Sequence, residues 1–291
     1  MDADVSREIW AKTLEESAIM QLARRINMPG AGVDIQTITG EPVADWVDET
    51  AAKPVSTHTF NKKTVRPYKL AVIEPFSEEF RRDKSALYDE CVNRLPKALA
   101  KKFDQTVIGT TAPGTGFDVL GSATKVSLIP PNGKTVYDQF IAVDALISEA
   151  DGIMNGIALA PQGKSLVMGA VDTVGHPLFT AGVSSNTVGN ILGAPVSIKK
   201  GVYKAGTAGS PGTPAIVGIA GDFEDAVFGT VEGIKMAVSD QASLTIGSGN
   251  SAQTISLWQN NMIAVRFEIE VAFAIKDINE FALLTGATPS A

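Results

Sequence analysis

Residues 263–275 read Ile-Ala-Val-Arg-Phe-Glu-Ile-Glu-Val-Ala-Phe-Ala-Ile, and every odd-numbered position in this stretch is apolar. Strict alternation places every second side chain on the same side of an extended chain, so the stretch predicts a strand with one buried face. The even positions include Arg266, Glu268 and Glu270, which suit a solvated opposite face. Such a strand spans about 40 Å at ~3.3 Å per residue, which is longer than most strands.

A long helix is expected from Ser77 to Gly109, and it could lie beside this strand. Pro75 precedes the segment and Ser77 is a candidate N-cap. One face carries an apolar residue at every fourth position: Leu87, Cys91, Leu95, Leu99 and Phe103. Pro96 should bend the helix and Gly109 should end it. A long helix on a long strand predicts an elongated platform.

The chain begins with a second amphipathic pattern. Residues 6–25 predict a helix because apolar side chains recur every four residues: Trp10, Leu14, Ala18 and Leu22. Met28-Pro29-Gly30 should end it.

From Val33 to Pro75 the sequence is β-prone, and the polar or small residues 49–53 divide it into two limbs. This pattern predicts a long hairpin or extended loop. A two-stranded ribbon with so little apolar surface is not stable alone, so it must lie on another surface.

The middle of the chain predicts a compact α/β domain. Residues 110–134 form a connection rich in Gly, Pro and Ser, and residues 136–150 predict a second amphipathic helix. Short apolar segments then alternate with Gly turns and predict strands at 156–160, 166–170, 192–198, 215–220 and 234–238.

Bulk properties limit the function. The chain has 291 residues, enough for one large domain or two modest ones, and a formal charge of −7. A negative balance argues against a tight grip on nucleic acid, although it does not exclude a container wall. The N-terminus has no signal-peptide pattern, and no stretch approaches the roughly 20 apolar residues of a membrane span. A soluble protein made in a cytoplasm is expected.

Candidate catalytic residues are sparse. The single cysteine, Cys91, is expected to be a buried apolar side chain, and His58 and His176 are expected to be solvated loop residues. They supply neither a metal cluster nor a Cys/His pair, so no metal or cofactor is expected. Residues 132–135, Asn-Gly-Lys-Thr, look like the end of a phosphate-binding loop, but Leu128 occupies the position of its first Gly. We interpret them as a turn.

Several segments, in this order, resemble the Hong Kong 97-type major capsid fold of tailed bacteriophages over nearly the whole chain. Residues 8–24 look like its N-terminal arm, and Ser-Glu-Glu-Phe at 77–80 looks like the start of the spine helix of its peripheral (P) domain. The final strand, ending in Ala272-Phe273-Ala274, looks like the P-domain strand under that helix. The remaining matches are to the extended E-loop, at 44–49, 60–63 and 69–71, and to turns of the axial (A) domain, at 172–178, 192–196 and 221–223.

The resemblance implies an α+β fold with a defined division of the chain. The implied parts are the N-terminal arm at 1–34, the E-loop at 35–76, the P-domain at 77–130 and 255–275, and the A-domain at 131–254 and 276–291. Many relatives carry a scaffolding segment before the arm, which a protease removes. This chain begins with Met almost at the arm, which favours a separate scaffold.

The implied function is structural, without enzymatic turnover or a cofactor. Copies would form hexamers and pentamers of an icosahedral head in the virion, assembled in the host cytoplasm. The implied partners are other copies of the chain, portal and scaffolding proteins, a decoration protein, and double-stranded DNA enclosed without sequence-specific binding. No membrane is involved. The implied assembly contacts of the E-loop are Trp46, Glu49, Lys53 and Phe60.

In some relatives an E-loop Lys forms an isopeptide bond to an Asn of a neighbouring subunit, aided by a Glu. The residues in the matching positions are Lys62, Asn261 and Glu268. The Lys must attack as a neutral amine, so a carboxylate in an apolar setting must accept a proton. The alternative is that Lys62 is a solvated loop lysine, Asn261 a turn residue and Glu268 a salt-bridge partner.

Two other functions stay open at this point. An encapsulin, a cellular nanocompartment with the same fold, would enclose a cargo enzyme instead of DNA. An α/β enzyme would require convergent titratable residues, and the sequence shows almost none.

Overall fold

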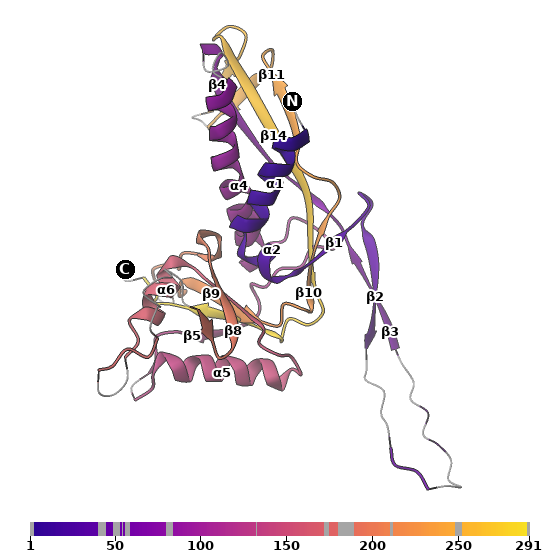
Figure 1. Cartoon of the computed structure of the whole chain (residues 1–291), viewed down its shortest axis with the longest axis vertical. Coiled ribbons are helices and arrows are strands. Elements are labelled where there is room, and N and C mark those ends of the chain that lie inside the picture. Colours follow the sequence, from indigo (N-terminus) through magenta and orange to yellow (C-terminus); the bar gives the residue numbers. More distant parts are fainter. Residues whose placement is uncertain are drawn as a thin grey trace.

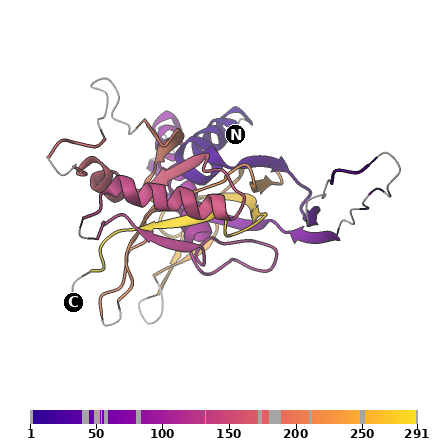
Figure 2. The ribbon, with the colours of Figure 1, turned by 90° about the horizontal axis from the view of Figure 1, so that it is seen from below.

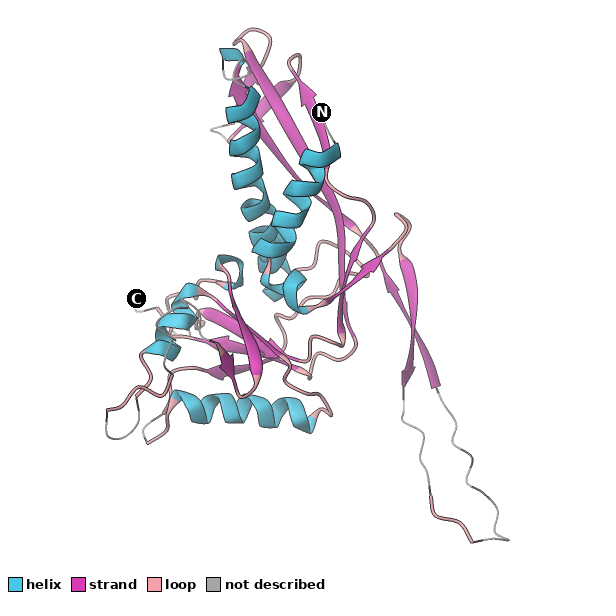
Figure 3. Ribbon diagram, in the orientation of Figure 1, coloured by secondary structure: helices cyan, strands magenta, loops and turns pink. Residues whose placement is uncertain are grey.

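The computed structural model describes residues 3–39, 45–48, 53, 55, 59–79, 84–131, 133–171, 175–179, 189–209, 212–247 and 252–289. Figure 1 shows three parts along the molecule: an elongated upper part with one long helix and one long strand, a compact lower part, and a hairpin that projects from the side. Figure 3 shows that helices and strands occur together in the upper and lower parts, as expected of an α+β fold.

The upper part is built on β14 (Met262–Ile275), which confirms the expected long strand. Its odd-numbered residues from Ile263 to Ile275 are between 0% and 6% exposed. β4 (Tyr68–Ser77) pairs antiparallel with one edge of β14, and β10 (Ala226–Thr230) and β11 (Lys235–Ser239) pair with the other. β1 (Arg24–Asn27) runs parallel to β10 and completes a five-stranded sheet.

The long helix α4 (Lys84–Ile108) packs on the odd face of β14. Leu95, Leu99 and Phe103 of the predicted apolar stripe are buried, and the ring of Phe103 meets that of Phe273 edge to face at 6.4 Å. The side chains of Leu87 and Cys91 lie outside the described residues. Ser77, expected to cap this helix, is instead the last residue of β4, because it pairs with Met262.

The expected helix at 6–25 is wrong in two places. The structure has α1 (Ala3–Glu16) and α2 (Ala18–Leu22), separated by Ser17, which is extended and accepts a hydrogen bond from the backbone of Met20. The helical pattern also stops before Arg24, where β1 begins. The cause of the break is a carboxylate on α4, described below.

The hairpin consists of β2 (Val33–Thr39) and β3 (Thr59–Val65), which pair antiparallel from Val33↔Val65 to Thr39↔Thr59. It projects away from the rest of the molecule in both views (Figures 1 and 2). Only two residues separate β3 from β4, so the second limb of the expected hairpin leaves it at Val65 and enters the β14 sheet.

The lower part contains a six-stranded sheet in the order β5-β15-β9-β6-β8-β7. Its strands are β5 (Thr124–Ser127), β15 (Phe281–Thr285), β9 (Ile216–Gly221), β6 (Gly156–Leu159), β8 (Ala194–Ile198) and β7 (Asn190–Ile191). α5 (Val136–Glu149) confirms the expected second amphipathic helix, and Thr135 and Asp138 form a capping box at its start. The other elements of the lower part are α6 (Pro161–Met168) and the 3-10 helix η1 (Lys200–Val202). A small hairpin of β12 (Ser243–Ile246) and β13 (Gln253–Ser256) lies between β11 and β14 in the sequence, and its base is joined to the start of β14 because the backbone N–H of Met262 donates to the carbonyl of Leu257.

Two of the expected strands differ from the structure. Residues 166–170 contain the end of α6, because a short apolar run does not distinguish a buried helix from a strand. Residues 234–238 contribute to β11, which joins β14 and not the lower sheet. β5, inside the expected connection at 110–134, was not predicted.

Sheet membership does not follow the expected domain boundaries. β4 was placed in the E-loop, and β10 and β11 in the A-domain, yet all three pair with β14. β5 was placed in the P-domain, yet it pairs with β15 of the lower sheet. A strand as long as β14 needs hydrogen-bond partners along both edges, and distant parts of the chain supply them.

Among the helices that the structure describes, none is long and apolar enough to cross a membrane.

Candidate functional site

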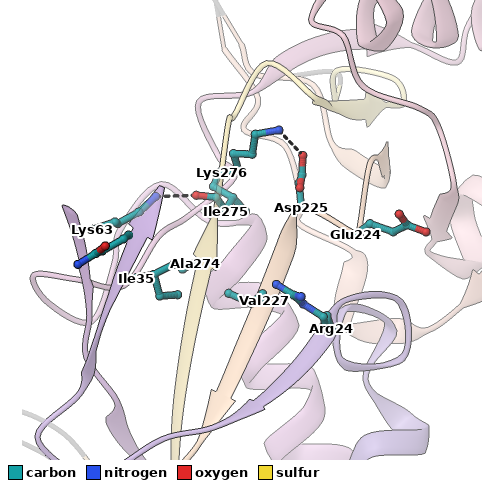
Figure 4. Close-up of a pocket in the computed structure, with 10 residues that line it drawn as sticks. Arg24, Ile35, Lys63, Glu224, Asp225, Val227, Ala274, Ile275 and Lys276 are labelled. Carbon is teal, nitrogen blue, oxygen red and sulfur yellow. Dashed lines mark hydrogen bonds and ion pairs between the residues drawn. The ribbon is translucent and has the colours of Figure 1, made fainter. Parts of the chain in front are cut away.

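The hairpin is fastened to the end of β14 by three residues, Lys63, Asp118 and Ile275, which we call the root clamp. Lys63 Nζ donates to the carbonyl oxygen of Ile275 at 2.7 Å and forms an ion pair with Asp118 at 2.5 Å. The same carboxylate accepts the backbone N–H of Ile275 at 2.9 Å. Figure 4 shows Lys63 reaching from the hairpin across to Ile275. The root clamp therefore joins β3 to β14.

Close backbone packing supports the root clamp. The backbone N–H of Arg66 donates to the carbonyl of Gly116 at 2.9 Å. Gly116 has φ +84°, and a Cβ there would lie 2.8 Å from the carbonyl oxygen of Thr64. Only glycine combines this backbone conformation with this close approach. The loop that carries Asp118 is thus held directly against the base of the hairpin.

A small cavity lies beside the root clamp, between the hairpin and the β14 sheet. Its volume is about 170 Å³, and it is lined in part by Arg24, Ile35, Lys63, Asp225 and Lys276. Figure 4 shows that its charged side chains are partly paired, since Lys276 Nζ lies 2.9 Å from Asp225. The cavity is smaller than the roughly 300–1,000 Å³ of typical small-molecule sites, so it does not indicate a substrate pocket.

Lys62 lies next to Lys63 on β3 and therefore points to the opposite face. Its ammonium is 2.7 Å from the Asp34 carboxylate, and its side chain is 65% exposed. The hydrogen bond from Lys62, together with one from Thr64, lowers the pKa of Asp34. Lys62 is thus accessible, but its ammonium is held by the Asp34 carboxylate. The pair must open before the amine can act as a nucleophile.

Asn261 lies in the turn before β14, with φ +48°. Its carbonyl oxygen accepts the backbone N–H of Glu78 at 2.8 Å, which leaves the side-chain amide out of this bond. Asn261 and the root clamp are at opposite ends of β14, about 45 Å apart at ~3.3 Å per residue. Lys62 lies next to the root clamp, so it cannot reach Asn261 of its own chain.

Glu268 is in the middle of β14, on the even face, and its side chain is 25% exposed. Its carboxylate lies 3.1 Å from Arg266, and Lys235 is its neighbour in β11. It is about 23 Å along the strand from Asn261 at ~3.3 Å per residue. In the single chain, the three candidate crosslinking residues are therefore an exposed ion-paired lysine, a turn residue and an ion-paired strand residue, and they do not converge.

A comparison with known protein families identifies the chain. The model of the phage capsid family matches residues 1–286. The chain belongs to the phage capsid family. The probable major capsid protein of Mycobacterium phage L5 is 33% identical over 301 residues, which cover 98% of this chain and 89% of the relative. The major capsid protein of Staphylococcus phage 80alpha is 26% identical over 285 residues, 96% of this chain and 82% of the relative.

Solved structures agree with this assignment. A structure from Mycobacterium phage Cain has a TM-score of 0.71 at 20% identity, and the match covers 94% of this chain and 91% of that one. The capsid of an empty GTA particle has a TM-score of 0.63 at 15% identity, covering 94% and 90%. The expected Hong Kong 97-type capsid fold is confirmed.

The capsid chain presents apolar side chains on its projecting hairpin. Trp46 is 101% exposed and Val55 is 88% exposed, although Trp is usually highly buried. Of the other expected assembly contacts, Lys53 is exposed, Glu49 lies outside the described residues, and so does the side chain of Phe60. An exposed Trp at this position suits burial by another molecule.

The capsid chain also has a buried carboxylate that sequence reasoning missed. Asp104 of α4 is 0% exposed and accepts hydrogen bonds from Ser17 Oγ at 2.5 Å and from the backbone of Ala18 and Ile19 at 3.0 and 3.4 Å. It thereby caps α2 and breaks the N-terminal helix at Ser17. Burial raises the pKa of Asp104 to about 6. The sequence feature that could have indicated this role is the Asp that directly follows Phe103, a member of the apolar stripe of α4.

Within the described ranges, no group of His, Cys, Asp and Glu could hold a metal ion. His176 lies in a described turn, whereas His58 lies outside the described residues. Glu280 also has a raised pKa, because burial and the charge of Asp225 raise it to about 7. Glu280 belongs to the loop between β14 and β15, and its carboxylate lies 3.7 Å from the Lys276 ammonium, as expected of a structural ion pair.

Proposed function

We propose that the chain is the major structural subunit of a tailed-phage head, in which hexamers and pentamers close into an icosahedral shell around double-stranded DNA. The observation that carries this proposal is the projecting hairpin, which ends beyond its own fold and carries the fully exposed Trp46. Among the described residues, its two strands form a backbone hydrogen-bond ladder only with each other. A neighbouring subunit supplies the missing surface.

Heterologous contacts explain how such a subunit makes a closed particle. The hairpin of one copy and the receiving surface of the next are different patches, and repeated contacts of this kind close into rings. Obligate interfaces bury roughly 2,000–5,000 Å² or more, which is enough to order an extended segment. The shell forms in the host cytoplasm and becomes the head of the virion. Portal, scaffolding and decoration proteins are its expected partners.

The test is to trim the hairpin while keeping its root. Residues 40–58 are replaced by Asn-Gly, which suits a two-residue turn between the paired Thr39 and Thr59. The trimmed chain should stay folded and soluble but form no shells by negative-stain electron microscopy, whereas the unaltered chain forms shells. Normal shells from the trimmed chain would contradict the proposal.

Unaltered particles isolated with a cargo enzyme in place of DNA would indicate an encapsulin.

We also propose that shells are crosslinked through Lys62 and Asn261. The neutral Lys62 amine attacks the side-chain amide carbon of Asn261, the new C–N bond forms, and ammonia leaves. A carboxylate accepts the proton from the amine and passes it to the leaving nitrogen. The separations along β14 require Lys62 and Asn261 to come from different copies. They also require Glu268 to come from a copy other than the one that supplies Asn261.

Denaturing gels of boiled shells test this step. Unaltered shells should give bands larger than the 30.5 kDa subunit. Lys62→Arg shells should give only the single-subunit band, because guanidinium is not a nucleophile here, whereas Lys53→Arg shells should match the unaltered ones. A single-subunit band from unaltered shells would exclude the crosslink and leave the shell function intact.

A further inference from the structure

A group of lysines lies on the helix side of the β14 sheet, in a chain whose formal charge is −7. Lys101 and Lys102 are on the outer surface of α4, and Lys199, Lys200 and Lys204 are in or beside η1. Four of them are exposed and Lys199 is half-buried. We call these five residues the lysine face.

Packing between α4 and η1 makes the lysine face one continuous surface. A Cβ on Gly201 would lie 2.7 Å from the carboxylate of Asp104 and 3.1 Å from the Cα of Lys101. η1 therefore rests directly on the turn of α4 that carries the two helix lysines. Lys102 and Lys204 line the same surface hollow, which has a volume of about 480 Å³. Lys102 and Lys204, which are far apart in sequence, thus lie at the same hollow.

The hollow has the chemistry of an anion site. Besides the two lysines, its polar side chains are uncharged: Gln105, Thr106, Thr110, Thr111 and Tyr203. No acidic residue lines it. Lysines and the N–H or O–H groups of these side chains are donors, whereas phosphate oxygens are acceptors, so the two are complementary.

Unlike six other lysines of the chain, those of the lysine face have no ion-paired carboxylate within the described ranges. In the described part of the chain, none of its five members forms an ion pair. By contrast, ion pairs neutralise several lysines elsewhere: Lys12, Lys62, Lys63, Lys69, Lys235 and Lys276. The one acidic residue beneath the face, Asp104, is fully buried. The positive charge is therefore free to meet an outside anion.

We propose that the lysine face contacts the phosphates of the packaged double-stranded DNA, with one backbone phosphate held between Lys102 and Lys204. This inference rests on the proposed capsid function. On the opposite face of the sheet, Glu268 and Glu270 are ion-paired with Arg266 and Lys69, so the charges there are balanced, whereas the helix side carries lysines without such pairs among the described residues. The contact involves the backbone alone and is independent of sequence, since lysine acts as a point charge toward phosphate.

The negative net charge does not oppose this contact. Charges separated by more than about 8–10 Å are largely screened at physiological salt, so the lysines next to a phosphate decide the local interaction. The remaining negative charge keeps the contact weak. A weak contact suits a shell that must both enclose its genome and release it.

Binding of a duplex to the full-length subunit tests the proposal. Fluorescence anisotropy with a labelled duplex is measured over a series of NaCl concentrations. Lys102→Gln with Lys204→Gln should weaken binding about tenfold and lower the slope of log affinity against log salt by about 2. The control, Lys125→Gln with Lys134→Gln, makes the same change in net charge at exposed lysines elsewhere and should leave the slope unchanged. Lys102→Arg with Lys204→Arg should retain binding, which separates loss of charge from misfolding.

Three outcomes would overturn the proposal: no duplex binding by the unaltered chain, an equal loss in the control, or lysine-dependent binding of poly-L-glutamate in preference to the duplex. The last outcome would assign the face to an acidic protein segment. Electron microscopy of the same preparations is independent of these results. Shells without duplex binding would contradict only the proposal for the lysine face, whereas duplex binding without shells would contradict the proposed capsid function.

Discussion

β14 and the β2–β3 hairpin are both long extended segments, but they obtain their stability from different sources. β14 has hydrogen-bonded strands on both edges and one face buried under α4. In the hairpin, β2 and β3 pair only with each other among the described residues, and Asp34, Gln36 and Lys62 are exposed. β14 finds its strand partners within one chain, whereas under the proposed function the hairpin is completed by a neighbouring copy. The subunit thus combines a core in which β14 is paired on both edges, built on β14 and α4 and called here the finished region, with a hairpin whose outer edges are unpaired among the described residues.

The largest expected effect is in the finished region. Phe273→Ala removes a fully buried ring that meets Phe103 and Phe117 between β14 and α4. Such a change lowers the free energy of unfolding by about 3–5 kcal/mol. Urea unfolding of the unassembled subunit measures it. Trp46→Ala is the matched change in the hairpin and should alter this free energy by less than about 0.5 kcal/mol. Equal losses would show that the hairpin is already part of the core.

The second effect concerns how the N-terminal helices attach to the finished region. Folding raises the pKa of Asp104 from 3.8 to about 6, so the folded chain binds a proton more tightly than the unfolded chain. The contribution of Asp104 to stability should therefore be largest below pH 4 and fall by about 3 kcal/mol as pH rises to about 7. Asp104→Asn should remove that part of the slope, and the raised pKa of Glu280 should leave a slope of the same sign. Unfolding curves at several pH values measure both.

An unchanged slope in Asp104→Asn would show that the carboxylate is already ionised in the folded chain. In that case the hydrogen bonds from Ser17, Ala18 and Ile19, together with the charge of Lys199, would outweigh the effect of burial on the pKa of Asp104.

The smallest effect on stability is expected at the junction between the two regions. Lys63→Met breaks the root clamp and leaves Asp118 without its cation, which costs about 1.5–3 kcal/mol. Lys62→Met removes only an exposed ion pair, worth about 0.2–1 kcal/mol. Lys63→Met should also give misshapen or no shells by electron microscopy, because the hairpin loses its fixed direction. Similar particles from the two variants would mean that neighbours alone orient the hairpin.

Sequence reasoning succeeded where the determining interactions are local or periodic. Alternation alone predicted β14, and the amphipathic pattern of residues 136–150 predicted α5. The break at Ser17 could not be predicted this way, since it depends on Asp104, 87 residues away. β5 is only a short strand, and it is defined by its pairing with β15.

The candidate site was predictable only as a set of residue types. Lys62 and Lys63 are equivalent in the sequence, and only the fold shows that Lys63 is occupied by Asp118 while Lys62 is exposed. The positions of Asn261 and Glu268 on one strand exclude their meeting within a chain. The proposed crosslink would require them to meet across neighbouring copies, whose arrangement a single sequence does not encode directly.

The short link between β3 and β4 makes the hairpin a lever. β3 ends at Val65 and β4 begins at Tyr68, and the proline at position 67 restricts the link between them. A force applied to the hairpin by a neighbour is therefore transmitted along the backbone into β4, and through its ladder with β14 to the spine of the subunit. In the proposed shell, with the root clamp as fulcrum, tension in the wall would pass from the hairpin to the β14 sheet across a link of only two residues.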